Sequence, residues 1–340
     1  MPIPDWVAGT ALPWLSEEAS VFGKGPLIVA NAPECERLRA CRTELGASVL
    51  IGIDESGTAP QAGDVFDVYL TTMAAPQKPW VSVQSIAATV DALQAAIGAN
   101  PSAAVTLVQV LRAQRHLTFE QALHMESFAY SALLGGGEFR DWRVAHRHDN
   151  DAQKMPEQGP AVVVERKGDT MCIELARPGG GNALTAELRD ALVEALRIAR
   201  LDDTIGSIEI RGRGRVFCSG GALGEFGMAQ DLAMAHQLRT VRSAALALHR
   251  LGARSRAFIQ GAAVGGGIEF AAAAHDLIAH PSAFFQLPEI SMGLIPGAGG
   301  TVTVARRIGW QRTAYMALSG ARIRARTALN WGLIDRIADA

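Results

Sequence analysis

A glycine-rich apolar stretch in the C-terminal half strongly limits how this chain can fold. It runs from Phe258 to Gly300 and reads FIQGAAVGGGIEFAAAAHDLIAHPSAFFQLPEISMGLIPGAGG. Three consecutive glycines, 265–267, precede Glu269, and a second carboxylate, Glu289, follows in a Leu-Pro-Glu-Ile turn. Because glycine has no side chain, such a run lets the backbone approach a ligand closely. Two carboxylates beside exposed backbone amides predict acid–base chemistry here.

The length of the chain predicts two domains. It has 340 residues, and a single hydrophobic core usually stops growing near ~250–300 residues. The polar, Pro- and Gly-punctuated segment 145–160 is the best boundary. We therefore expect an irregular arm over 1–25, an N-terminal α/β and helical region over 26–144, a linker over 145–160 and a catalytic core over 161–340. His146 and His148 lie in this linker with no third ligand nearby, which favours a solvated segment over a metal site.

Charge and cysteine content exclude several classes of protein. Lys and Arg number 32 against 34 Asp and Glu, a formal charge of −2, so no global field favours nucleic acid or an acidic membrane surface. The four cysteines lack CxxC spacing, which predicts reduced thiols and a cytoplasmic location. The N-terminus lacks the pattern of a signal peptide, and the apolar run 257–274 is interrupted by Glu269, so no membrane span is expected.

The N-terminal region reads first as strands and then as helices. Short apolar runs rich in β-branched residues predict strands over 26–32, 48–54 and 65–72, with a helix over 34–45 between the first two. Helical spacing of apolar residues follows over 85–97 and 101–112. Thr118 and Gln121 form a capping-box pattern that predicts a third helix through Leu134, ended by glycines 135–137.

The C-terminal region alternates strands and helices. Strands are predicted over 161–166, 170–175, 206–212, 257–263 and 276–280. Helices are predicted over 185–200, 228–251 and 266–274, with further helices through Trp331. Such alternation favours an α/β core with parallel strand pairing.

Two stretches together resemble the enoyl-CoA hydratase/isomerase (crotonase) superfamily. They are the 258–300 stretch and the upstream segment VFCSGGAL, residues 216–223. The resemblance covers residues 161–339, about half of the chain, and the motifs stand in the family's order. It implies an α/β fold with the ββα-superhelix core of crotonases, preceded by a smaller α/β N-terminal region that ends in a helical module.

That helical module is displaced relative to the family. The run over 99–142 resembles the helices that usually follow a crotonase core, yet here it comes before the core, and Ala340 lies close behind NWGLIDRI, where the module would ordinarily begin. Our hypothesis is that residues ~26–143 are a crotonase half-duplicate that supplies the missing helices. The alternative is an unrelated helical domain, since amphipathic helices are common.

The resemblance also implies where an enolate would be held. Two preorganised backbone N–H groups aimed at a thioester oxygen stabilise the negative charge that develops there. In the family pattern these donors map to Gly221 and Gly266. A tight turn would explain each of these glycines taken alone. An oxyanion hole is favoured because the glycines occur together with the two acids in the family's order. Cys218 precedes the first donor without a placed base, so we expect a packed thiol.

Glu269 and Glu289 coincide with the two glutamates that hydratases of this family use to activate water. One carboxylate takes a proton from water as its oxygen attacks C3, and the other, protonated, supplies one to C2. Burial among apolar neighbours is expected to raise the pKa values of both. Family isomerases often keep only the second acid. The residues expected to contact the substrate are Asn182, Ala183, Leu184, Gly220, Ala222, Gly265 and Pro288.

The sequence departs from the family at two of these places. The segment 178–181 lacks a basic residue that is frequent before the Asn-Ala-Leu turn, and Ala222 stands where an Asp commonly follows the oxyanion residue. Arg140, Arg143 and Arg177 are candidate phosphate partners, with solvated arginines as the alternative.

We therefore expect an enoyl-CoA hydratase that adds water to a 2-enoyl-CoA thioester through an enolate in an oxyanion hole. The alternatives are an enoyl-CoA isomerase or other acyl-CoA enolate chemistry, and a non-catalytic relative that binds acyl-CoA. No metal or redox cofactor is expected, and coenzyme A belongs to the substrate. The expected partners are this acyl-CoA and further copies of the chain in a trimer or hexamer, with no nucleic acid and no membrane.

Overall fold

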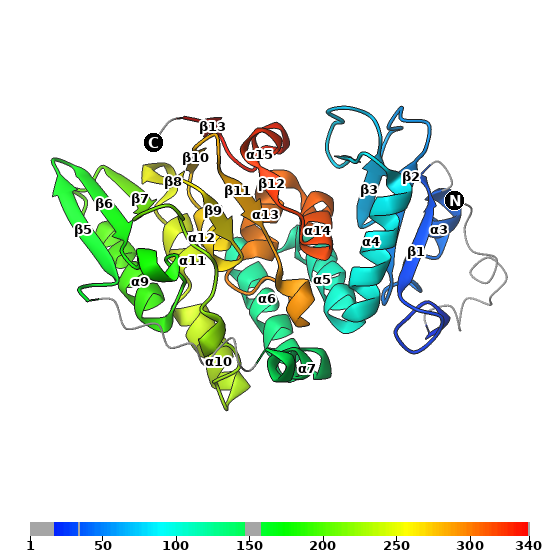
Figure 1. Cartoon of the computed structure of the whole chain (residues 1–340), viewed down its shortest axis with the longest axis horizontal. Helices are drawn as coiled ribbons and strands as arrows, with labels where there is room; N and C mark the ends of the chain where they lie inside the picture. The colour runs from blue at the N-terminus through cyan, green and yellow to red at the C-terminus, as the bar shows by residue number, and fades with distance from the viewer. Residues whose placement is uncertain (1–16, 33–34, 147–157, 339–340) are drawn as a thin grey trace.

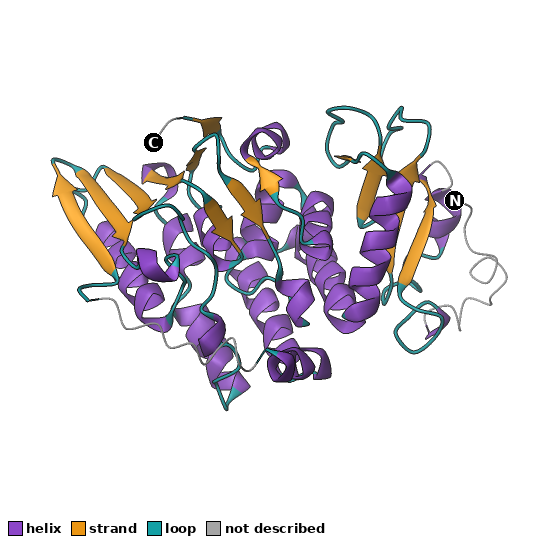
Figure 2. Cartoon of the chain, in the orientation of Figure 1, coloured by secondary structure: helices purple, strands orange, loops and turns teal. Residues whose placement is uncertain are grey.

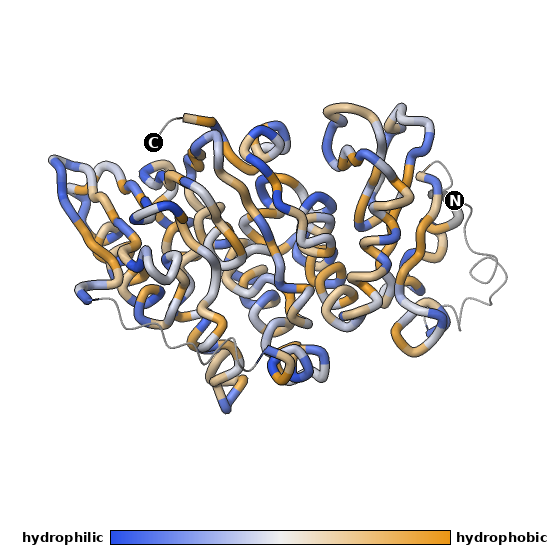
Figure 3. The backbone as a smooth tube through the Cα atoms, viewed as in Figure 1, coloured by the Kyte–Doolittle hydropathy of each residue, from blue (hydrophilic) through white to orange (hydrophobic). Residues whose placement is uncertain are grey.

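The computed structural model describes residues 17–32, 35–146 and 158–338. Sheets lie at both ends of the elongated molecule, with most of the helices between them (Figure 1, Figure 2). The N-terminal sheet is parallel, in the order β1-β2-β3-β4. Its strands are β1 (Leu27–Asn31), β2 (Val49–Asp54), β3 (Val68–Thr71) and β4 (Val81–Ser82). In Figure 3 much of β1 and β2 carries hydrophobic colours, as expected for strands whose side chains are largely buried.

A larger sheet lies at the opposite end of the molecule. It has six strands in the order β13-β10-β8-β7-β6-β5, parallel except for the β5–β6 hairpin. The strands are β5 (Val162–Lys167), β6 (Thr170–Leu175), β7 (Ser207–Gly212), β8 (Ser255–Ile259), β10 (Asp276–Ala279) and β13 (Arg336–Ile337). A third sheet, in the order β12-β11-β9, is made of β9 (Ala262–Val264), β11 (Phe284–Gln286) and β12 (Ile323–Arg324).

The helices divide into an N-terminal and a C-terminal set. The first set is α3 (Cys35–Ala40), α4 (Ile86–Ala99), α5 (Pro101–Ala113), α6 (Phe119–Leu134) and α7 (Gly137–Ala145). The second set is α9 (Ala186–Leu201), α10 (Leu232–Val241), α11 (Ala244–His249), α12 (Gly266–Ala271), α13 (Gly300–Ile308), α14 (Trp310–Ser319) and α15 (Ala325–Trp331). None of the helices in the described part of the chain has the length and apolarity that a membrane crossing needs.

Elements with strong local signals form as predicted. The capping box at the start of α6 is present, with the Thr118 hydroxyl accepting from the Gln121 N–H and the Gln121 side chain accepting from the Thr118 N–H. Proline stands at the first position of α5, where its missing N–H costs nothing. The α/β class and the parallel pairing predicted from the alternation are confirmed.

Several predicted boundaries are wrong, each for a local reason. The single strand expected over 257–263 is two strands in two sheets, because Gly261 adopts a positive φ of 61° between them. The helix expected over 228–251 is α10 and α11, since Ser243 caps a new start by accepting from the Leu246 N–H at 3.1 Å. The helix expected over 34–45 is the shorter α3. A further helix, α7, was not predicted; it begins at Gly137, the last of the three glycines expected to end the helical run.

The N-terminal helices pack directly on the C-terminal core. Helices α5 and α6 contact α13, α6 contacts α10, and α14 contacts α4 and β3 (Figure 1). One continuous apolar core includes side chains from both halves. Buried Arg312 of α14 donates to the carbonyl oxygens of Trp80 and Pro76, at 3.1 and 3.0 Å. This is the packing that the displaced-module hypothesis requires, whereas the domain limits stay predictions and residues 147–157 of the linker lie outside the described residues.

Candidate active site

Two backbone N–H groups from separate segments meet at the centre of the C-terminal core. Gly266 is the first residue of α12, so its N–H has no partner within the helix, and the helix dipole favours an anion there. A Cβ atom placed on Gly266 would lie 3.7 Å from the backbone nitrogen of Gly221. In the described part of the chain neither N–H has a hydrogen-bond acceptor. Both N–H groups are therefore unoccupied, and they belong to segments that lie next to each other.

Two further glycines allow these segments to approach each other. Gly220 and Gly265 have φ values of 102° and 46°, which residues with side chains rarely adopt. A Cβ atom on Gly220 would lie 3.9 Å from the Gly265 Cα. Leu184 pairs with this segment as an isolated bridge and donates its N–H to the Gly220 oxygen at 2.8 Å. The predicted residues Leu184, Gly220 and Gly265 thus build the frame of the donor pair.

Glu289 lies directly over this frame. It opens a short 3-10 turn, residues 289–292, and only 6% of its surface is exposed. Its Oε1 atom is 2.5 Å from where a Cβ atom on Gly265 would stand, so only glycine fits beneath it. Its Oε2 atom is buried without a hydrogen-bond partner in the described part of the chain. Burial, followed by the negative charges of Glu269 and Glu126, raises the pKa of Glu289 well above its ordinary value.

Glu269 projects from α12 into the same region and is 2% exposed. Its Oε2 atom accepts the N–H groups of Ala298 and Gly300 at 2.7 and 2.8 Å. Burial raises the pKa of Glu269 to about 7, while hydrogen bonds from these N–H groups act in the opposite direction. The burial and raised pKa values expected for the two acids from sequence are both confirmed.

A third buried carboxylate, Glu126, was not predicted. It belongs to α6 in the N-terminal region and is 1% exposed. Its Oε1 atom accepts the Gly299 N–H at 2.7 Å, and its Oε2 atom accepts the Thr301 N–H and hydroxyl at 2.8 and 2.6 Å. Burial, with the charge of Glu269, raises the pKa of Glu126 to about 8, against the hydrogen bonds from Thr301 and Gly299.

Glu126 and Glu269 together hold one turn. They accept alternate backbone N–H groups over 298–301, at the start of α13, so each carboxylate positions the segment that the other binds. A sequence signal for Glu126 did exist. It stands at helical spacing from apolar residues on the buried side of α6, namely Phe119, Ala122, Leu123 and Leu133.

The other predicted contacts lie near the site in different roles. Asn182 is fully buried, and its amide bonds only to the backbone of Arg177, Arg213 and Val216, so it shapes the turn that carries Ala183. Pro288 positions Glu289 as the residue before the 3-10 turn. Ala222 lines a groove described below.

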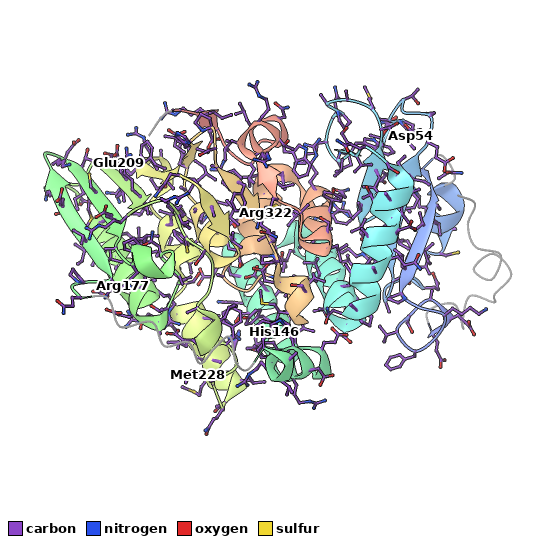
Figure 4. All side chains as sticks on the ribbon, in the orientation of Figure 1. Asp54, His146, Arg177, Glu209, Met228 and Arg322 are labelled. Atoms are coloured by element: carbon purple, nitrogen blue, oxygen red, sulfur yellow. The ribbon has the colours of Figure 1, made fainter. Side chains whose placement is uncertain are left out.

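Of the three arginines considered as phosphate partners, Arg177 and Arg143 are bonded to the chain itself, whereas Arg140 is exposed beside Asp141. Arg177, labelled in Figure 4 beside α9, donates to Gly159, Pro160 and Glu187 at 2.8 to 2.9 Å. Arg143 donates to the Gly227 oxygen at 2.9 Å. Cys218 is fully buried and burial raises the pKa of its thiol to about 12, which confirms a packed, unreactive role.

An open groove of about 770 Å³ adjoins the donor pair and is lined by Ala222, Leu184 and Tyr130. Exposed apolar side chains of the α10 region, including Met234 and Leu238, form another part of its wall. Met228, which also lines it, lies beside α10 in Figure 4. A smaller cavity of about 70 Å³ shares part of this wall and reaches Glu126 and glycines 297 and 299. The groove therefore has room for an apolar chain.

Comparison with known proteins identifies the family of the C-terminal half. The family model described as enoyl-CoA hydratase/isomerase matches residues 165–340, more than half of the chain. This chain belongs to the enoyl-CoA hydratase/isomerase family. The resemblance inferred from sequence and the crotonase-like fold are thereby confirmed, and the chain is an enzyme of that family.

Individual relatives and solved structures match about half of this chain. A 2,3-dehydroadipyl-CoA hydratase of Escherichia coli is 34% identical over 183 residues, which cover 52% of this chain and 68% of the relative. A probable enoyl-CoA hydratase of Rhodobacter capsulatus is 39% identical, covering 48% of this chain and 62% of the relative. A crystal structure of an enoyl-CoA hydratase from Mycobacterium smegmatis superposes with a TM-score of 0.50 at 26% identity, covering 53% of this chain and 70% of that one.

Proposed function

We propose that the protein is an enoyl-CoA hydratase that adds water across the double bond of a 2-enoyl-CoA thioester. The observation that carries the proposal is the convergence of two buried carboxylates, Glu269 and Glu289, on a pair of unoccupied backbone N–H groups. Donors preorganised at a developing oxyanion typically contribute several kcal/mol to transition-state stabilisation. Family members similar to this chain are named as hydratases, which supports the same reaction class.

The environments of the two acids suggest different roles. Glu269 accepts two backbone N–H groups, which favour its ionised form. As a carboxylate it takes a proton from water while the water oxygen bonds to C3. Glu289 has the unpartnered oxygen and the pKa that is raised well above normal, so it is the protonated acid. It delivers its proton to C2 as the enolate held by Gly221 and Gly266 collapses.

The remaining parts of the substrate follow from this placement. The thioester oxygen binds between Gly221 and Gly266. We place the acyl chain in the groove beside α10, because its largely apolar wall includes Leu184 and Ala222, which flank the two donors. Coenzyme A enters as part of the substrate, and the proposed reaction draws its acid, base and oxyanion donors from the chain alone. The protons balance in number: Glu269 gains the proton that water loses, and Glu289 loses the proton that C2 gains. Release of the proton from Glu269 to solvent and uptake of one by Glu289 restore both acids for the next turnover.

Double-bond isomerisation is the second candidate, and one observation favours it. The Oε2 atom of Glu269 holds the 298–300 turn, whereas the Oε2 atom of Glu289 is buried without a hydrogen-bond partner among the described residues. A single acid of this kind could move a proton between C2 and C4 of an enolate.

Glu269→Gln separates the two reactions. The wild-type protein and the variant are incubated with 2-enoyl-CoA and with 3-enoyl-CoA, and the products are identified by mass. Hydration predicts a 3-hydroxyacyl-CoA product that falls by about 100-fold or more in the variant, since general-base catalysis contributes about that much. Conversion of 3-enoyl-CoA without any hydroxyacyl product, unchanged in Glu269→Gln, would replace the hydratase proposal by isomerisation.

A further inference from the structure

The cavity that reaches Glu126 is lined by three arginines, which differ in whether a carboxylate lies beside them. They are Arg189, Arg239 and Arg242. Arg189 pairs with Asp190 at 2.8 Å, and Arg242 lies 3.8 Å from a Glu194 oxygen. Within the described ranges no carboxylate stands within 4 Å of the Arg239 guanidinium. Of the three arginines in this wall, Arg239 is therefore the one without a carboxylate partner among the described residues.

Neutral groups fix the position of Arg239. Its Nε donates to the Ser127 hydroxyl at 3.1 Å, and its Nη2 donates to the Ser127 oxygen at 3.3 Å and to the Ser131 hydroxyl. The guanidinium also lies over the Tyr130 ring, 5.0 Å from its centre. A guanidinium carries five N–H donors. The two on Nη1 have no acceptor among the residues described here, although Arg239 is half-buried.

Burial of an unpaired cation is unfavourable, so the position of Arg239 calls for an anion. Burial lowers the pKa of Arg239, and only weaker contributions from Tyr130 and Glu126 oppose it. The three buried glutamates do not supply that anion at close range, since each is more than 4 Å from the guanidinium, and Glu126 and Glu269 are bonded to backbone N–H groups. The guanidinium keeps its positive charge and two unused N–H donors on Nη1, which can form charge-assisted hydrogen bonds to an anionic oxygen such as that of a carboxylate.

The location of Arg239 specifies where such a carboxylate would come from. Arg239 lines both the groove beside α10 and the adjoining cavity, and the groove wall around it includes apolar Leu238 and Met234. A ligand that fills this space therefore needs an apolar chain and a negative group. The phosphates of coenzyme A are excluded from this role, because the proposed orientation sends the acyl chain, not the nucleotide, into the groove.

We propose that Arg239 is a specificity-determining residue that binds a carboxylate at the far end of the acyl chain. The preferred substrates are then 2-enoyl thioesters of dicarboxylic acids rather than of simple fatty acids. This inference rests on the proposed function, because it uses the orientation of the thioester at Gly221 and Gly266.

Binding of unreactive substrate analogues tests the inference separately from hydration. Titration calorimetry compares saturated acyl-CoA thioesters in matched pairs: succinyl with butanoyl, glutaryl with pentanoyl, and adipyl with hexanoyl. In the wild-type protein the dicarboxylic member of the best-fitting pair is expected to bind about 10- to 100-fold more tightly, the factor of a charge-assisted hydrogen-bonded pair. Equal or weaker binding of the dicarboxylic member in every pair would overturn the inference, even if the protein is an active hydratase.

Two variants identify the residue responsible. Arg239→Met should remove the preference by weakening the dicarboxylic member alone, and Arg239→Lys should keep part of it, since Lys retains the charge but not the planar guanidinium that Ser127 and Ser131 hold in place. Arg242→Gln is the matched control, because it removes an already paired charge from the same wall, and should leave the ratio within each pair unchanged. If Arg239→Met changed both members of a pair alike, Arg239 would act in general folding or catalysis and the inference would fail. Absence of hydration with intact preference would instead count against the proposed reaction only.

Discussion

Replacing Glu126 by Gln tests whether the N-terminal helices complete the active site. The side chain is 1% exposed and presents an oxygen to each of two backbone N–H groups, those of Gly299 and Thr301. Glutamine has nearly the same volume but only one oxygen. Whichever way its amide faces, an NH₂ group is directed at one of these N–H donors, so one buried backbone donor loses its acceptor.

The size of the effect follows from that single lost acceptor. A buried donor left without a partner costs about 1–3 kcal/mol. An unfolding entropy of about 2.1 cal/mol/K per residue gives roughly 0.7 kcal/mol/K for a chain of 340 residues. Glu126→Gln should therefore lower the unfolding temperature by about 1–4 °C.

A second effect of Glu126→Gln concerns catalysis. The negative charge of Glu126 helps to raise the pKa of Glu289, so removing that charge lowers the pKa of Glu289.

Scanning calorimetry and the pH dependence of hydration measure the two effects. If Glu289 is the protonated acid, the alkaline limb of the pH–rate profile should move to lower pH in Glu126→Gln, because the acid loses its proton earlier. Glu120→Gln is the control: Glu120 lies on the same helix but is exposed and paired with Arg250 at 3.0 Å, so neither quantity should change appreciably. A Glu126→Gln protein that matches this control in both measurements would refute the reasoning.

Three further predictions concern single features of the site. Stability should fall as pH rises from about 4.5 to about 8. In the folded state the pKa values of Glu126 and Glu269 are about 8 and about 7, against an ordinary value of 4.5, so the folded protein binds more protons than the unfolded chain in this window. Unfolding temperatures that rise across this pH range would contradict the prediction. Gly265→Ala should lower kcat/KM by about 100-fold, since a Cβ there meets Glu289 at 2.5 Å in a backbone with φ of 46°, and a fully active variant would disprove the placement. Cys218 should resist iodoacetamide in the folded protein and react after unfolding, whereas rapid labelling of the native thiol would show that it is not buried.

Much of the fold was predictable because its signals are local. The capping box of α6 and the proline that begins α5 specify helix starts within a few residues. The short strands β11 and β13 were missed because they have only 3 and 2 residues, and form through pairing with distant strands. Pairing of this kind leaves almost no pattern in the segment itself.

The candidate site shows the same limit. Gly221, Gly266, Glu269 and Glu289 could be chosen because they stand in family motifs of one half of the chain. Glu126 could not be found that way, since it lies 173 residues before Gly299, whose N–H it accepts. The available signal was its position on the apolar side of α6. An acid on a buried helix face needs hydrogen-bond partners that the helix itself does not supply, so such an acid points to a contact with another segment.

The most direct test of the account is the loss of conjugated-enoyl absorbance when the purified protein meets a short and a long 2-enoyl-CoA, with Glu289→Gln in parallel. The account predicts loss of absorbance with the wild-type protein on at least one chain length, and a rate at least about 100-fold lower for Glu289→Gln, which keeps the volume of the acid but cannot donate its proton. Equal rates for the two proteins would contradict the role of Glu289. No loss with either chain length or with a dicarboxylic 2-enoyl-CoA, despite measurable binding of coenzyme A thioesters, would contradict the hydratase assignment itself.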